Sequence, residues 1–179
     1  MANTKWVVDP MHSEIQFKVK HLMLTTVTGH FRYFNIEACT PDEEFAGIAS
    51  LIFTADVNSI STNNEQRDTH LKSPDFFDVE QHNEIRFVAM GYENTGGNNY
   101  HLHGILSIRD ITKPVTVMVE FGGIVIDPYG QTKAGFTVRG KVSRKDFGLS
   151  WNAVTEAGSV VVSDEIRLHA EVQLVKQSA

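Results

Sequence analysis

Apolar and polar residues alternate along most of this 179-residue chain, and this period of two is the feature that most limits its fold. The alternation is clearest over residues 13–20, where Ile15, Phe17 and Val19 share one face and polar residues occupy the other. Successive side chains of a β-strand point to opposite faces of its sheet, so this segment is predicted to be a strand with one solvent-exposed face. Similar runs cover residues 31–38, 46–57, 84–92, 100–109, 115–126, 133–142 and 163–175.

Turn-forming residues separate these runs. They lie at Thr28-Gly29, at 94–99 (NTGGNN), at 127–130 and at Ala157-Gly158. About eight strands of roughly 8–12 residues with short links are typical of an antiparallel barrel or sandwich. In an eight-stranded barrel, strands of this length turn the interior into a deep tube. Nothing divides the chain, so we expect a single all-β domain over residues 1–179.

One segment, residues 60–73, breaks the alternation. Thr62 and Glu65 have the spacing of a capping box, in which Thr caps the amide three residues on and Glu reaches back. Pro74 disfavours continuation of a helix. A short helix is therefore predicted over about residues 63–72, between two strands.

The predicted helix gathers Arg67, His70 and Leu71 on one side, because these residues are spaced i, i+3 and i+4. Basic groups above an apolar tube would suit an amphiphile with an anionic or polar head. The alternative is an amphipathic helix that closes the barrel end, with Arg67 bound to a structural carboxylate.

Composition narrows the function classes. The 41% hydrophobic and 21% charged fractions are ordinary for a soluble globular protein. Sixteen basic and 22 acidic residues give a net charge of −6, which argues against a nucleic-acid partner and a polybasic membrane anchor, and we expect no membrane insertion. The single cysteine, Cys39, excludes an intrachain disulfide. Residues 1–9 lack the features of an export signal, so we expect a cytoplasmic protein as the chain is written, and a periplasmic one if a signal has been removed.

Catalytic and metal-binding patterns are weak. Of eight histidines, His101 and His103 project from one face of a predicted strand, as a metal-binding pair could. No third ligand is spaced to join them, so they are expected to be surface or rim histidines and no metal site is predicted. The sequence has no nucleophile elbow or phosphate-binding glycine loop, and acidic neighbours disfavour a reactive Cys39 thiol. We therefore predict no catalytic residue and no enzymatic activity.

Five segments carry motifs that together resemble one family. Residues 6–21 read W-x-V-D-x-x-H-S-x-I-x-F-x-V-x-H, and residues 64–78 read N-x-x-R-D-x-H-L-x-S-x-x-F-F-D. Three further motifs lie at residues 104–115 (GILSIRDITKPV), 144–151 (RKDFGLSW) and 162–166 (VSDEI). In this order, over nearly the whole chain, they resemble the YceI-like family, also described as lipocalin-like polyisoprenoid-binding proteins.

The resemblance implies an extended eight-stranded antiparallel, lipocalin-like barrel around a long apolar tunnel. Family members are similar in holding a prenyl chain or another long lipid there, with its head near the mouth, and many are dimeric. The eleven phenylalanines, which could simply fill a core, would then line the tunnel. The expected function is non-catalytic binding, transport or storage of an isoprenoid such as a polyprenyl phosphate or a ubiquinone-like prenyl quinone, by a homodimer that needs no other cofactor.

The expected ligand contacts combine inward-facing strand residues with the helix segment. They are Phe17, Val19, Phe31, Phe53, Arg67, His70, Leu71, Phe76, Phe77, Phe87, Phe136 and Trp151. Arg144 and Lys113 are further candidates for contact with the head group. Two alternatives stay open: an enzyme acting on an isoprenoid lipid, with His70 or His12 as acid or base, and a stress-related interaction module whose tunnel is vestigial.

Overall fold

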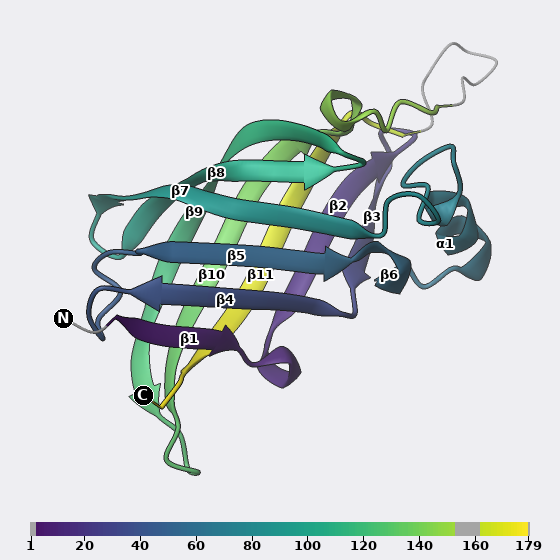
Figure 1. Ribbon diagram of the computed structural model, residues 1–179. Helices are drawn as coiled ribbons and strands as arrows, with labels where there is room; N and C mark the ends of the chain where they lie inside the picture. Colours follow the sequence, from purple (N-terminus) through teal and green to yellow (C-terminus); the bar gives the residue numbers. More distant parts are fainter. Residues whose placement is uncertain (1–2, 153–161, 179) are drawn as a thin grey trace.

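The computed structural model describes residues 3–152 and 162–178, and its strands wind into a barrel with a short helix at one end (Figure 1). The strands of the described residues are β1 (Thr4–Val8), β2 (Glu14–His21), β3 (Thr25–Phe31), β4 (Phe34–Thr40), β5 (Ser50–Asp56), β6 (Ile60–Ser61), β7 (Glu84–Gly96), β8 (Asn99–Ile108), β9 (Ile111–Ile126), β10 (Thr132–Ser143) and β11 (Glu165–Lys176). The helices of the same residues are α1 (Glu65–Lys72) and three short 3-10 helices, η1 (Pro10–His12), η2 (Val57–Ser59) and η3 (Arg144–Phe147). None of these helices has the length and apolar character needed to span a bilayer.

The antiparallel sheet closes on itself through β1. This strand pairs with β4 on one side and with β11 on the other, so that Trp6 lies opposite both Ala38 and Lys176. β2 then continues along β11, β3 pairs with β2, and β6 pairs with β3. β1 and β2, which follow each other in the chain, therefore act together as one bent strand, and so do β3 with β4 and β5 with β6. With β7 to β11 they form a closed eight-stranded barrel, and the predicted fold class is confirmed.

The turn predicted at Thr28-Gly29 is wrong, because both residues lie inside β3. The chain reverses earlier, at Leu22 and Met23, whose φ angles are +53° and +57°. Gly29 meets a packing requirement instead: a Cβ there would lie 2.2 Å from the Cζ of Phe17 on the paired strand. The glycine is therefore explained by the aromatic ring that covers it.

Several element bounds also differ from those predicted. β1 and β3 were not expected as strands, and the run predicted from residue 46 becomes a strand only at Ser50. β7 continues through the first half of the NTGGNN segment to Gly96, and β8 begins at its last residue, Asn99. The turn predicted at residues 127–130 is confirmed by hydrogen bonds that link Asp127 to Gly130 and Gln131. The predicted turn at Ala157-Gly158 lies outside the described residues.

The predicted helix is confirmed, but its N-terminal cap differs from the capping box. Asn64 is the N-cap, and its side-chain oxygen accepts a hydrogen bond from the Arg67 backbone N–H at 3.0 Å. Thr62 lies outside the helix, where its N–H and hydroxyl both donate to Asp68 Oδ1, at 2.8 and 2.6 Å. Asn64 thus caps the N-terminus of α1, and Thr62 is hydrogen-bonded to Asp68 in the same helix.

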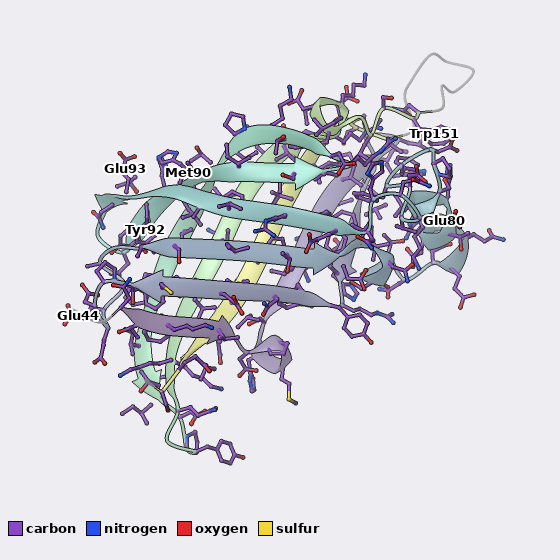
Figure 2. The ribbon with its side chains drawn as sticks, viewed as in Figure 1. Glu44, Glu80, Met90, Tyr92, Glu93 and Trp151 are labelled. Carbon is purple, nitrogen blue, oxygen red and sulfur yellow. The ribbon has the colours of Figure 1, made fainter. Side chains whose placement is uncertain are left out.

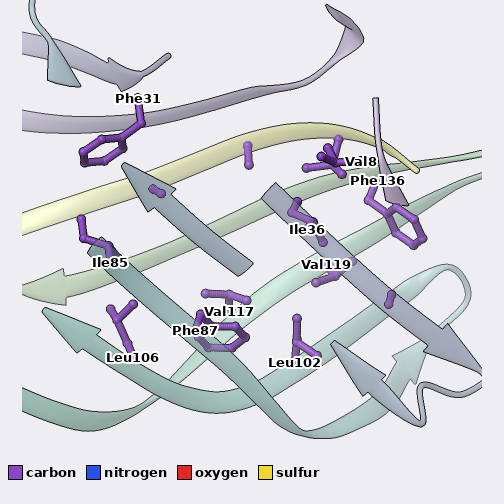
Figure 3. Close-up of a cluster of buried hydrophobic side chains, with 14 of the residues drawn as sticks. Val8, Phe31, Ile36, Ile85, Phe87, Leu102, Leu106, Val117, Val119 and Phe136 are labelled. Atoms are coloured by element: carbon purple, nitrogen blue, oxygen red, sulfur yellow. The ribbon is translucent and has the colours of Figure 1, made fainter. Parts of the chain in front are cut away.

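Inward-facing apolar side chains line the inside of the barrel, as the close-up in Figure 3 shows for Ile85, Phe87, Leu102 and Val117. In β7 the inward positions change from odd-numbered to even-numbered residues at Met90. Ala89 pairs with Gly104 and Gly91 pairs with His103, so the β7–β8 ladder skips Met90, which forms a β-bulge.

Candidate functional site

An apolar cavity of about 280 Å³ occupies the barrel interior. This volume is just below the roughly 300–1,000 Å³ typical of small-molecule sites. Nine of the predicted ligand contacts line it: Phe17, Val19, Phe31, Phe53, Leu71, Phe76, Phe77, Phe87 and Phe136. The strand register inferred from alternation thus places the predicted residues on the inner face.

An aromatic cluster fills the barrel end opposite α1. Phe45, in the β4–β5 loop, is 1% exposed, and its ring centroid lies 4.6 Å from that of Trp6 and 4.9 Å from that of Phe136. Trp6 is fully buried and donates its indole N–H to Thr40 Oγ1 at 3.0 Å. Phe45 has a φ of +56°, a left-handed conformation that a bulky side chain rarely adopts. A residue held there against its own preference indicates tight packing of this end.

At the α1 end, His70 and Trp151 lie outside the cavity lining but pack against Phe76, which belongs to it. The His70 and Trp151 rings meet edge to face, with centroids 4.6 Å apart. His70 Nε2 lies 2.8 Å from Asp75 Oδ2, so its imidazole already has a carboxylate partner. Figure 2 places Trp151 at this end of the molecule. These two predicted contacts therefore support the wall at the α1 end of the cavity.

Arg67, predicted to contact a head group, is exposed and does not line the cavity. Its Nε donates to Thr62 Oγ1 and its terminal nitrogen donates to the Thr62 carbonyl oxygen, both at 2.7 Å. The guanidinium thus links α1 to Thr62 in the preceding segment through these hydrogen bonds. Lys113 is also exposed and outside the lining.

Arg144, the other head-group candidate, lines the cavity, but its side chain is only 3% exposed. Its guanidinium donates to four backbone carbonyl oxygens, those of Leu149, Trp151, Val162 and Ser163, at 2.6 to 3.3 Å. Burial lowers the pKa of Arg144, and Asp164, 3.5 Å away, acts in the opposite direction. The arrangement holds together the segments on either side of residues 153–161.

Tyr92 is a lining residue that sequence reasoning missed. Its ring stacks on that of Tyr100, with centroids 4.3 Å apart and planes 5° from parallel. The Tyr92 hydroxyl is buried with no hydrogen-bond partner among residues 3–152 and 162–178, and burial, followed by the nearby Tyr100 phenol, raises its pKa. Simple alternation from Phe87 places Tyr92 outside, and only the bulge at Met90 turns it inward.

The structure also brings a third group to the His101–His103 pair. Glu93 lies directly opposite His101 in the β7–β8 register, and the three side chains offer ligand atoms within 4.8 Å of one another. The prediction that no third ligand joins these histidines is therefore wrong. The sequence could not reveal it, because the bulge at Met90 decides which face Glu93 occupies.

Comparison with known proteins places this barrel in a family. The model of the YceI-like domain matches residues 6–174. The chain belongs to the YceI-like family. A UPF0312 protein of Staphylococcus epidermidis is 36% identical to this YceI-like chain over 173 residues, which cover 95% of the chain and 96% of that protein. A UPF0312 protein of Staphylococcus aureus is 32% identical over the same shares.

Solved structures show the same fold. A Campylobacter jejuni YceI protein is 29% identical, with a TM-score of 0.74 over 89% of this YceI-like chain and 90% of its own. Burkholderia cenocepacia BcnA, at 22% identity, has a TM-score of 0.79 over 93% and 98% of the two chains. A domain from Saccharophagus degradans described as polyisoprenoid-binding has a TM-score of 0.70 at 12% identity, over 96% and 98%.

Proposed function

We propose that this protein binds a long-chain isoprenoid lipid, such as a polyprenyl phosphate or a prenyl quinone, in the barrel cavity and carries or stores it without chemical change. The observation that carries the proposal is the apolar cavity between α1 and Phe45. The Saccharophagus degradans domain, described as polyisoprenoid-binding, shares the barrel and supports the same ligand class. The aromatic rings around Phe45 fill one end of the barrel but not the cavity itself. The remaining apolar cavity favours ligand binding over a vestigial tunnel.

Burial of an apolar chain supplies enough free energy for useful affinity. Each buried methylene contributes about 0.8 kcal/mol, so one five-carbon isoprene unit contributes on the order of 4 kcal/mol. Association and ordering cost an estimated 4–15 kcal/mol. Four or five buried units contribute about 16–20 kcal/mol, which exceeds this cost, and shorter chains are expected to bind weakly.

The chain is expected to enter at the α1 end, because aromatic rings fill the opposite end around Phe45. A polyprenyl phosphate entering tail first leaves its anionic head near α1 and the Tyr92 hydroxyl unpaired. A prenyl quinone entering ring first brings carbonyl oxygens that can accept the Tyr92 hydrogen bond. The two head groups therefore predict different effects of Tyr92→Phe on affinity.

The test is a binding titration with geranylgeranyl phosphate and with a ubiquinone that carries a prenyl tail of the same four units, followed by native mass spectrometry. Ala170 lines the cavity, so Ala170→Phe should occupy its space and weaken binding at least tenfold. Arg167→Phe is the matched control on the same strand, at an exposed position, and should bind like wild type. Thermal unfolding checks that both variants fold.

Equal affinity of Ala170→Phe and wild type would show that the lipid does not occupy the cavity. Recovery of a chemically altered lipid would replace the carrier proposal with an enzyme. Loss of affinity for the quinone alone in Tyr92→Phe would select the quinone. The homodimer expected from the resemblance stays a prediction, which sedimentation velocity can test.

A further inference from the structure

The outer face of β7 and β8 carries a cluster of three metal-ligating side chains, Glu93, His101 and His103. Glu93 Oε1 lies 3.8 Å from His101 Nδ1 and 3.5 Å from His103 Nε2. Two ligands each about 2.0–2.1 Å from a tetrahedral zinc ion are about 3.4 Å apart. The two measured separations are therefore close to those of a formed site, and small side-chain rotations would complete it.

The strand framework fixes this arrangement. His101 and His103 are two residues apart on β8 and so share a face, and Glu93 pairs directly with His101 across the β7–β8 ladder. Met90, the bulge residue, reverses the parity of β7 and turns Glu93 outward beside the histidines, and Figure 2 shows Glu93 and Met90 on the outside of this strand. Ligands held on paired strands are positioned more accurately than ligands on loops.

A supporting hydrogen bond orients one of the imidazoles. His103 Nδ1 lies 2.7 Å from Thr116 Oγ1 on the neighbouring strand β9. If Nδ1 donates its proton there, Nε2 presents its lone pair to the cluster, as in protein metal sites whose histidines have a second hydrogen-bond partner. The His101, His103 and Glu93 side chains are 41%, 44% and 63% exposed, so an ion and its water ligands can reach them.

We propose that Glu93, His101 and His103 bind a divalent transition-metal ion, with water in the remaining coordination positions. Two imidazoles and one carboxylate are a ligand set that suits Zn²⁺ and Cu²⁺, and the ordinary affinity order places Cu²⁺ above Zn²⁺. The three residues lie on the outside of the barrel wall, so metal binding does not require lipid in the cavity. The site is thus independent of the proposed lipid-binding function.

Isothermal titration of the untagged protein with ZnCl₂, and separately with CuCl₂, tests the site. We expect one ion per chain, and at least a tenfold loss of affinity in His101→Ala and in His103→Ala, with a smaller loss in Glu93→Gln. His169→Ala is the matched control, because His169 Nε2 also faces a glutamate, Glu171, at 3.0 Å, but belongs to no three-ligand group in residues 3–152 and 162–178. It should bind like wild type.

Three outcomes would overturn the proposal: no binding by wild type at micromolar metal, equal binding by the cluster variants, or an equal loss in His169→Ala. Apo melting temperatures close to wild type show that the variants are folded, since the three side chains are exposed. Geranylgeranyl phosphate binding should be unchanged in the three cluster variants, whose residues lie outside the cavity lining, so failure of the metal site and failure of the lipid proposal can be distinguished.

Discussion

Replacing Phe45 tests the packing of the barrel end opposite α1. The side chain is 1% exposed and contacts the rings of Trp6, Phe121 and Phe136. A buried phenylalanine removes roughly 150–250 Å² from water, worth about 4–6 kcal/mol at about 25 cal/mol per Å². Measured Phe→Ala costs of about 3–5 kcal/mol agree. At roughly 2–4 °C per kcal/mol for a chain of this size, Phe45→Ala should lower Tm by roughly 6–20 °C.

The backbone of Phe45 supplies a second, more specific test. Its φ of +56° costs an L-residue roughly 1–2 kcal/mol, and glycine avoids this cost. In ordinary strand or helix positions glycine is less stable than alanine by about 0.5–1 kcal/mol. Phe45→Gly should therefore be more stable than Phe45→Ala, which reverses the usual order.

Chemical denaturation of the two variants measures both differences. Tyr129→Ala is the control, because this aromatic side chain is 89% exposed and should change stability by less than about 0.5 kcal/mol. A Phe45→Ala variant within about 1 kcal/mol of wild type would refute the packing argument. A glycine variant less stable than the alanine variant would refute the left-handed backbone.

Three further predictions concern other contacts. Gly104→Ala should lower the free energy of unfolding by about 1–3 kcal/mol, because its Cβ would lie 2.3 Å from Phe87 Cζ and 2.6 Å from the Val88 carbonyl oxygen. The control is Gly135→Ala, where a Cβ meets nothing within 4 Å, and it should be nearly neutral in denaturant titrations. Arg144→Lys should destabilise the fold, because one ammonium cannot replace the guanidinium at four carbonyl oxygens, and a melting temperature equal to that of wild type would contradict this. Hydrogen bonding to Lys133, and to a lesser extent to His12, lowers the pKa of Asp9 from its ordinary 3.8 to about 2, although partial burial acts in the opposite direction. The ionised Asp9 carboxylate therefore stabilises the fold fully above about pH 5, and this stabilisation is lost as the pH falls through 2. In a Tm-against-pH series, Asp9→Asn should be less stable than wild type at neutral pH and the difference should shrink between about pH 5 and 2; a constant difference would contradict the linkage.

Much of the fold follows from local sequence, because strand alternation and turn residues act over a few positions. The inward set that includes Phe17, Phe53 and Phe87 was predicted correctly because β2, β5 and the first half of β7 alternate regularly. The helix was predicted from a break in alternation, although its cap is Asn64. These features depend on residues close in the chain.

The missed features depend on pairing between distant residues. Phe45 reaches the core from a loop, and nothing in its neighbourhood predicts burial. Arg144 looked available for a head group, yet the carbonyl oxygens of Leu149, Trp151, Val162 and Ser163 accept its hydrogen bonds. Arg67 looked available too, but binds Thr62. A side chain's partners in three dimensions decide its role, and residue type and spacing alone do not supply them.

The bulge at Met90 lets β7 hold one extra residue without changing which later side chains face the cavity. Met90 is skipped in the β7–β8 ladder, and Tyr92 and Glu93 pair with their β8 partners in regular alternation after it. Deletion of the Met90 codon would therefore remove the bulge and leave Tyr92 inward and Glu93 outward. Among relatives, a one-residue difference in length at this position should leave the residues aligned to Tyr92 and Glu93 on the same faces. A deletion between Phe87 and Ala89 with Met90 retained would instead have to be absorbed by the bulge itself.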